Sequence, residues 1–159
     1  LRFLFGEAET IYCQKQTVNK TIKGEDVTTS MLRMKSGVVC VQEISFSSIL
    51  EHEIFPQTLL LVEGDKGSIR LDADFHLSVS TADKTTKETV EMKKYDWQTD
   101  RLKPEPPSIV ACNENILLDM LGKQNAETTG EDNFETVRLV WAAYESAASG
   151  KPVNLNQFT

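Results

Sequence analysis

Residues 27–46, VTTSMLRMKSGVVCVQEISF, carry the pattern that decides the fold. Two runs rich in β-branched and other apolar residues flank Ser36-Gly37, a two-residue turn that suits an antiparallel hairpin. The alternation divides the second run between two faces: Val38, Cys40, Gln42, Ile44 and Phe46 on one, and Val39, Val41, Glu43 and Ser45 on the other. Both faces are partly apolar, so we expect that neither face of the sheet formed by this hairpin is simply exposed to solvent.

Further strand-like runs lie on both sides of this hairpin, separated by short turns that contain glycine or aspartate. They are Glu9–Gln16, Thr58–Val62, Ser68–Leu71, Phe75–Ser80 and Thr85–Met92. Short connections favour antiparallel pairing, so the sequence predicts a meander. Thr58–Val62 is a continuous apolar run, which predicts burial on both faces.

Two helices are expected in the last third of the chain. The first follows the prolines at 104, 106 and 107, is capped by Ser108 and ends at Gly122, and the second runs from Thr129 to Gly150. Their predicted buried stripes are Ile109, Cys112, Ile116, Leu117, Met120 and Leu121 in the first, and Phe134, Val137, Trp141, Tyr144 and Ala148 in the second. The predicted fold class is α+β: one domain over residues 1–159, with a large, open-faced, predominantly antiparallel sheet of about six to seven strands and two main helices packed on one face.

Composition limits the function. The balance of 24 acidic against 17 basic residues gives a formal charge of -7, which argues against a nucleic-acid partner. No apolar stretch approaches the roughly 18 residues that cross a bilayer. Cys13, Cys40 and Cys112 match neither a disulfide framework nor a zinc pattern, so we expect reduced core thiols in a cytoplasmic protein. Residues 1–6 resemble the last turn of a helix, which indicates that the chain begins inside an element.

The familiar catalytic signatures are missing from this sequence. No Gly-x-Gly-x-x-Gly follows a strand, and the nearest glycine pair, Gly64 and Gly67, is predicted to bound a hairpin turn. There is no phosphate loop, nucleophile elbow or His-Glu-x-x-His pair. We therefore predict no catalytic, cofactor-binding or metal-binding residue in this chain.

One histidine stands beside carboxylates, at Glu51-His52-Glu53. In an extended segment the two glutamates point away from His52, so the bland interpretation is a solvated strand end. The functional alternative makes His52 a substrate-side residue on the rim of a site that another domain completes. His76 is expected in water, and Trp97 is expected to pack at the core edge, with stacking on a ligand as the alternative.

Several segments resemble one enzyme family. The segments TTGEDN (128–133), VRLV (137–140), YESA (144–147) and GKPV (150–153) look like the carboxy-terminal end of the Gfo/Idh/MocA oxidoreductases. The hairpin 63–72 resembles the family's central hairpin, and residues 1–18 resemble its entry into the sheet. The resemblance covers nearly the whole chain and is weakest over 81–107.

The resemblance implies a two-domain parent, in which an amino-terminal Rossmann domain holds NAD or NADP and this sheet helps to form the substrate site and the oligomer interface. The family's Glu-Lys-Pro and Asp-x-Gly-x-His-x-x-Asp motifs match no position here. We therefore expect the carboxy-terminal domain of a dehydrogenase for a sugar, polyol or similar molecule, inactive alone and homo-oligomeric through the open sheet face. Two rivals remain: a stand-alone interaction module, and a domain that binds a small molecule on its sheet.

Overall fold

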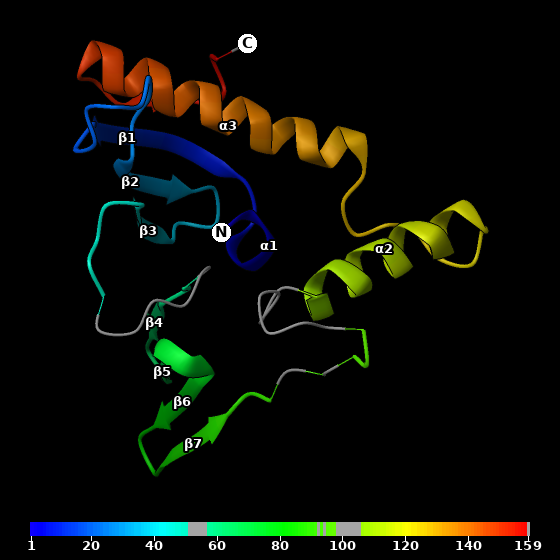
Figure 1. Cartoon of the computed structure of the whole chain (residues 1–159). Helices are drawn as coiled ribbons and strands as arrows, with labels where there is room; N and C mark the ends of the chain where they lie inside the picture. The colour runs from blue at the N-terminus through cyan, green and yellow to red at the C-terminus, as the bar shows by residue number, and fades with distance from the viewer. Residues whose placement is uncertain (51–56, 92, 94, 98–105, 159) are drawn as a thin grey trace. The chain divides into compact units, whose positions relative to one another are not determined.

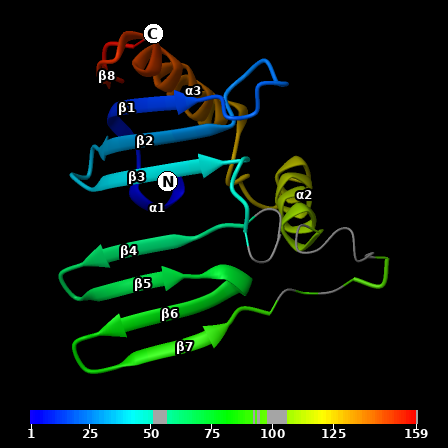
Figure 2. The same cartoon turned by 60° about the vertical axis from the view of Figure 1, so that its left-hand side comes forward.

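The computed structural model describes residues 1–50, 57–91, 93, 95–97 and 106–158. Its strands pair antiparallel in two four-stranded sheets, ordered β3-β2-β1-β8 and β4-β5-β6-β7, and its two long helices are α2 and α3 (Figures 1 and 2). The predicted α+β class with antiparallel strands is confirmed, although the hydrogen bonds form two sheets of four instead of one larger sheet. The chain divides into two compact units, a first unit of Leu1–Ile49 with Thr128–Thr159 and a second unit of Leu50–Glu127.

The first unit is a sheet covered by one helix. Its elements are α1 (Arg2–Phe5), β1 (Ala8–Gln16), β2 (Val27–Met34), β3 (Val39–Ser45), α3 (Gly130–Ser149) and β8 (Val153–Asn154). The predicted hairpin is confirmed, but its turn is longer than the expected two residues Ser36-Gly37. The Met34 N–H donates to the Val38 carbonyl at 2.8 Å, so residues 35–37 connect the two strands. Gly37 has a positive φ of 91°, and its N–H donates to the Met34 carbonyl at 2.9 Å. β1 pairs with β2 on one side and with β8 on the other, a two-residue strand that the sequence did not predict.

The core of the first unit lies between this sheet and α3. Ile11, Leu32 and Met34 point toward the helix and are at most 3% exposed. Cys40 is buried on the same face, whereas Val39 and Val41 are exposed on the other. The assignment of β3 residues to two faces is therefore confirmed, and only one of these faces is covered within the unit.

The ends of α3 are as predicted, but its buried face is not. The Thr129 side chain accepts from the Asp132 N–H, and Gly150 closes the helix in the left-handed conformation. The predicted stripe is wrong because its members are exposed: Phe134, Val137, Trp141, Tyr144 and Ala148. The buried face is the opposite one, centred on Ala142 and Ser146. These small residues let the helix approach β1 so closely that the Cys13 N–H donates to Ser146 Oγ at 2.9 Å.

The second unit is an antiparallel meander followed by a helix. Its elements are β4 (Leu60–Gly64), β5 (Gly67–Leu71), a 3-10 turn (Ala73–Phe75), β6 (His76–Thr81), β7 (Thr85–Thr89) and α2 (Pro106–Met120). The predicted meander is confirmed. Leu61 is 59% exposed, so the expectation that the apolar run would be buried on both faces is wrong.

The helix α2 departs from prediction at its start and on its surface. It begins at Pro106, ahead of the predicted cap Ser108, because a proline in the first turn forfeits no intrahelical hydrogen bond. Its predicted stripe is exposed, with Met120 at 79%, and Cys112 is an exposed thiol, whereas Cys13 and Cys40 are buried. None of the described side chains of the second unit is buried, so the apolar stripe of α2 covers no core there.

Candidate functional site

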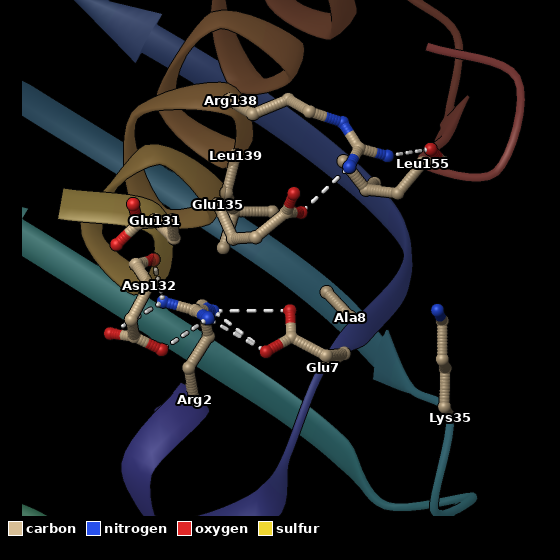
Figure 3. A pocket seen from close by; sticks show the side chains of 10 residues that line it. All are labelled: Arg2, Glu7, Ala8, Lys35, Glu131, Asp132, Glu135, Arg138, Leu139 and Leu155. Atoms are coloured by element: carbon tan, nitrogen blue, oxygen red, sulfur yellow. Dashed lines mark hydrogen bonds and ion pairs between the residues drawn. The ribbon is translucent and has the colours of Figure 1, made fainter. Parts of the chain in front are cut away.

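One pocket of the first unit lies where the chain enters β1. It has a volume of about 510 Å³ and is lined by residues from α1, β1, the β2–β3 turn, α3 and the C-terminal segment (Figure 3). The lining residues are Arg2, Glu7, Ala8, Lys35, Glu131, Asp132, Glu135, Arg138, Leu139 and Leu155. Charged side chains dominate this set, so the chemistry of the pocket depends on how those charges are paired.

Arg2 is at the centre of that pairing. Its Nη2 donates to Glu7 Oε1 at 2.7 Å and to Asp132 Oδ1 at 2.9 Å. Its Nη1 donates to the Asp132 carbonyl at 2.9 Å and to Thr136 Oγ1 at 2.7 Å, and its Nε reaches the Glu7 carboxylate at 3.1 Å. Figure 3 shows the guanidinium between Glu7 and Asp132. One side chain thus joins α1, the start of β1 and the first turns of α3.

The ion pairs fix the charges of this joint. The hydrogen bond with Glu7 raises the pKa of Arg2, against the effect of burial, and the same bond lowers the pKa of the Glu7 carboxyl. Both groups are therefore charged at neutral pH. All three guanidinium nitrogens already donate to protein acceptors, so Arg2 serves as a structural joint instead of a receptor for an external anion.

The other two cations of the pocket differ from each other. Arg138 donates to Glu135 Oε2 at 2.6 Å, to the Phe158 carbonyl at 3.0 Å and to the Leu155 carbonyl, and so fastens the C-terminal segment to α3. The Lys35 ammonium makes no hydrogen bond to any described residue, although its backbone N–H donates to the Glu7 carbonyl at 2.8 Å. Four carboxylates face three cations, so the pocket does not favour a phosphate group.

A second hollow of about 540 Å³ lies between the β1–β2 connection and α3. The Tyr144 hydroxyl donates to the Glu25 carboxylate, and this bond raises the pKa of the tyrosine and lowers that of Glu25. Lys15 Nζ lies 4.9 Å from the centre of the Tyr144 ring and 3.8 Å from Glu25 Oε2. These contacts hold the connection against the helix and leave no acid and base poised around a shared reacting atom.

The residues singled out from the sequence lie elsewhere. His52 falls in 51–56, outside the described residues, so its substrate-side role stays a prediction. His76 is exposed, as predicted, with Nδ1 at 2.9 Å from Thr89 Oγ1. The prediction that Trp97 packs at the core edge is wrong, since it is 58% exposed and its ring stacks on Tyr95 at 5.2 Å.

Sequence reasoning missed the Arg2 joint. Arg2 and Asp132 are 130 positions apart, and no local motif links residues so distant. The only usable signal was the helix start at Thr129, which places Asp132 in the first turn, where a carboxylate favours the positive end of the helix.

The described residues do not fit a nicotinamide dinucleotide. The N-terminus of α3 carries Glu131 and Asp132 in its first turn, and acids there repel a pyrophosphate. Gly64 and Gly67 bound the two-residue turn between β4 and β5 instead of opening a helix. Within the described ranges, no group of three His, Cys, Asp or Glu side chains could hold a metal ion. No helix in that same part of the chain has the length and apolar content to cross a membrane.

Comparison with known proteins gives closely related sequences. The chain is 35% identical over 154 residues to a D-apiose dehydrogenase from Paraburkholderia graminis and 32% identical to one from Rhizobium rhizogenes. These alignments cover 97% of this chain and 41% and 45% of the two relatives, so the chain spans less than half of their length.

A solved structure of a related protein has the same fold as this chain. An oxidoreductase from Agrobacterium radiobacter, in complex with NAD+, L-tartaric acid and magnesium, superimposes with a TM-score of 0.94 at 31% identity. The match covers 99% of this chain and 46% of that protein. A family profile described as the C-terminal alpha/beta domain of an oxidoreductase family matches residues 1–155. The chain therefore belongs to the Gfo/Idh/MocA oxidoreductase family and represents its C-terminal domain.

Proposed function

We propose that this chain is the C-terminal domain of an NAD- or NADP-dependent dehydrogenase that oxidises a sugar, a polyol or a similar small hydroxylated molecule. The observation that carries the proposal is the identity of 35% and 32% to two D-apiose dehydrogenases over 97% of the chain. The Agrobacterium radiobacter oxidoreductase adds support, because it was solved with NAD+ and a small hydroxylated acid.

In this proposal, the nucleotide and the proton-transfer groups belong to an amino-terminal Rossmann domain outside the present sequence. The described residues offer no site for the dinucleotide. In the pocket at the entry to β1, Arg2 is paired with Glu7 and Asp132. Arg138 is paired there with Glu135. The bound nucleotide would supply the hydride acceptor. The isolated chain is accordingly expected to be inactive, and its contribution is to form one wall of the substrate pocket, where His52 is the substrate-side candidate.

We also propose that the open face of the first sheet joins two copies of the protein. The register places Tyr12 opposite Met31 and Met31 opposite Val41, so these three side chains form one row across β1, β2 and β3. They are 38%, 55% and 60% exposed, and Val39 adds a further 55% exposed side chain to the same face. Leaving such a surface in water costs about 25 cal/mol per square ångström.

The test of the activity is an assay of the full-length protein that contains this domain. Purified protein is offered NAD or NADP with aldoses, polyols and hydroxy acids, and nucleotide reduction is followed at its near-ultraviolet absorbance. We expect reduction with at least one aldose or polyol, and no reduction by residues 1–159 alone. A full-length protein that binds neither nucleotide contradicts the proposal and supports the rival interaction module.

The test of the open face is sedimentation of the same full-length protein. We expect Val41→Glu to shift the protein toward the monomer, because it places a charge within the Tyr12–Met31–Val41 row. Gln42→Glu, on the same strand but on the other face, is the matched control and leaves the mass unchanged. A wild-type protein that is monomeric at high concentration overturns this part of the proposal.

A further inference from the structure

Arg2 has more contacts than the small helix it belongs to would need. Its side chain is 13% exposed and bonds to groups of Glu7, Asp132 and Thr136, two of them on α3. The helix α1 itself has no buried residue, and Phe3 is 88% exposed. These Arg2 contacts, called the clamp below, therefore fix the direction of α1 while leaving Phe3 and Leu4 exposed.

A separate anchor holds the other end of α1. The Ser36 hydroxyl donates to the Phe5 carbonyl at 3.0 Å, and Phe5 packs against the edge of the core. These contacts lie at the end of α1 that leads into β1, whereas Arg2 lies at the end nearest Leu1. Without Arg2, this anchor at Phe5 would remain, and the end of α1 nearest Leu1 would lose its side-chain contacts to α3.

We propose that Arg2 is a positioning residue of the full-length enzyme: by clamping α1 to the first turns of α3, it sets how the preceding domain is placed against this one. This inference rests on the proposed function, in which the nucleotide domain precedes Leu1. In that arrangement, a rotation of α1 would displace the nucleotide domain relative to the substrate wall. Such displacement is costly, since an error of about 1 Å in the reacting geometry can lower a rate by about 100-fold.

The ionisation of the clamp does not change with pH in the neutral range, so the clamp is suited to permanent positioning and not to a pH switch. Arg2 is charged at every physiological pH, and its bond lowers the pKa of Glu7, so both partners stay ionised across the neutral range. A lysine would keep the charge, but it cannot present a planar fork to Glu7, Asp132 and Thr136 at once. The geometry of the guanidinium is therefore the property to test.

The experiment compares Arg2→Ala, Arg2→Lys and Asp26→Asn in the full-length protein. Asp26→Asn is the stability control, because it loosens a hydrogen-bond network of the same unit that does not include α1. Well below the thermal midpoint, we expect Arg2→Ala to lower kcat by about 10- to 100-fold. The nucleotide Kd should change less than about twofold, since the nucleotide binds in the other domain. Arg2→Lys should regain only part of kcat. Asp26→Asn should keep the wild-type kcat, even if its thermal midpoint falls as far as that of Arg2→Ala.

A second measurement does not depend on activity. Amide hydrogen exchange of the full-length protein should show faster exchange over residues 1–7 in Arg2→Ala and unchanged exchange in β2. Unchanged exchange over 1–7, or an equal loss of kcat in Asp26→Asn, overturns the inference. If the wild-type protein reduces neither nucleotide, the proposed function fails while the exchange measurement still decides whether Arg2 is a clamp.

Discussion

The two units of the chain are built from similar sheets but reach different degrees of burial. Each contains four antiparallel strands. In the first unit α3 covers one sheet face and encloses a core around Leu32 and Met34, whereas in the described part of the second unit no side chain is buried. In that sheet, Leu60, Leu71 and Leu77 pair in one row and are only half-buried. An apolar strand face thus becomes a core only where another element of the chain covers it.

The strongest test of this comparison is a pair of identical truncations. Leu32→Ala removes a side chain that is 1% exposed, and we expect it to lower the free energy of unfolding by about 2–5 kcal/mol, because it leaves a cavity. Leu61→Ala, at a site 59% exposed, should cost less than about 1 kcal/mol. Urea unfolding measures both. Equal losses would show that the second sheet is as well covered as the first.

One buried polar contact between α3 and the first sheet can be removed by a single substitution. Ser146 is fully buried, accepts from the Cys13 N–H and donates to the Lys151 carbonyl at 2.7 Å. Ser146→Ala leaves that N–H without its acceptor, so we expect a loss of about 1–3 kcal/mol in unfolding free energy. Ser149→Ala, near the exposed end of the same helix, is the control. A loss no larger than that of the control would mean that the close approach of α3 does not depend on this hydroxyl.

The second sheet has its own sensitive point at Gly67. A Cβ there would lie 2.1 Å from the Ser80 carbonyl oxygen, and the residue has a φ of +153°. We expect Gly67→Ala to separate β5 from β6 and to lower the unfolding free energy by at least about 1 kcal/mol. The exchange rates of β5 and β6 amides should rise while those of β1 and β2 stay constant. Gly24→Ala, where a Cβ meets open space, is the control.

The smallest expected effect is a pH dependence of the stability of the first unit, which comes from Asp26. The Ser47 hydroxyl, at 2.5 Å, and the N–H groups of Val18 and Asn19 lower the pKa of Asp26 from 3.8 to about 2. Because the folded pKa is depressed, this stabilisation is fully present above pH 3.8 and is lost as the pH falls through 2. The difference in urea midpoint between the wild type and Asp26→Asn should therefore narrow from pH 4 to pH 2. If the difference in urea midpoint stays constant from pH 4 to pH 2, the pKa of Asp26 is not lowered by these hydrogen bonds.

The bulky stripe of α3 shows where sequence reasoning failed. Both faces of the helix are apolar at helical spacing, one through large residues such as Phe134 and Trp141 and the other through Ala142 and Ala143. Hydrophobic periodicity favours the bulky face because it contains more apolar area. The structure buries the small face instead, since the helix lies close to the β1 backbone. The periodicity of apolar residues in a sequence gives no information on how closely a helix packs against a sheet.

By itself, the sequence indicated the family resemblance, which the comparisons confirmed. It also determined the local features of this protein: the strand pattern, the hairpin between β2 and β3, and the limits of α3. These depend on contacts between residues that are near in sequence. Only the tertiary structure decided which face of α3 is buried, where β8 pairs, and that Arg2 meets Asp132. Such contacts join residues more than 100 positions apart, and their geometry is set by how the whole unit packs.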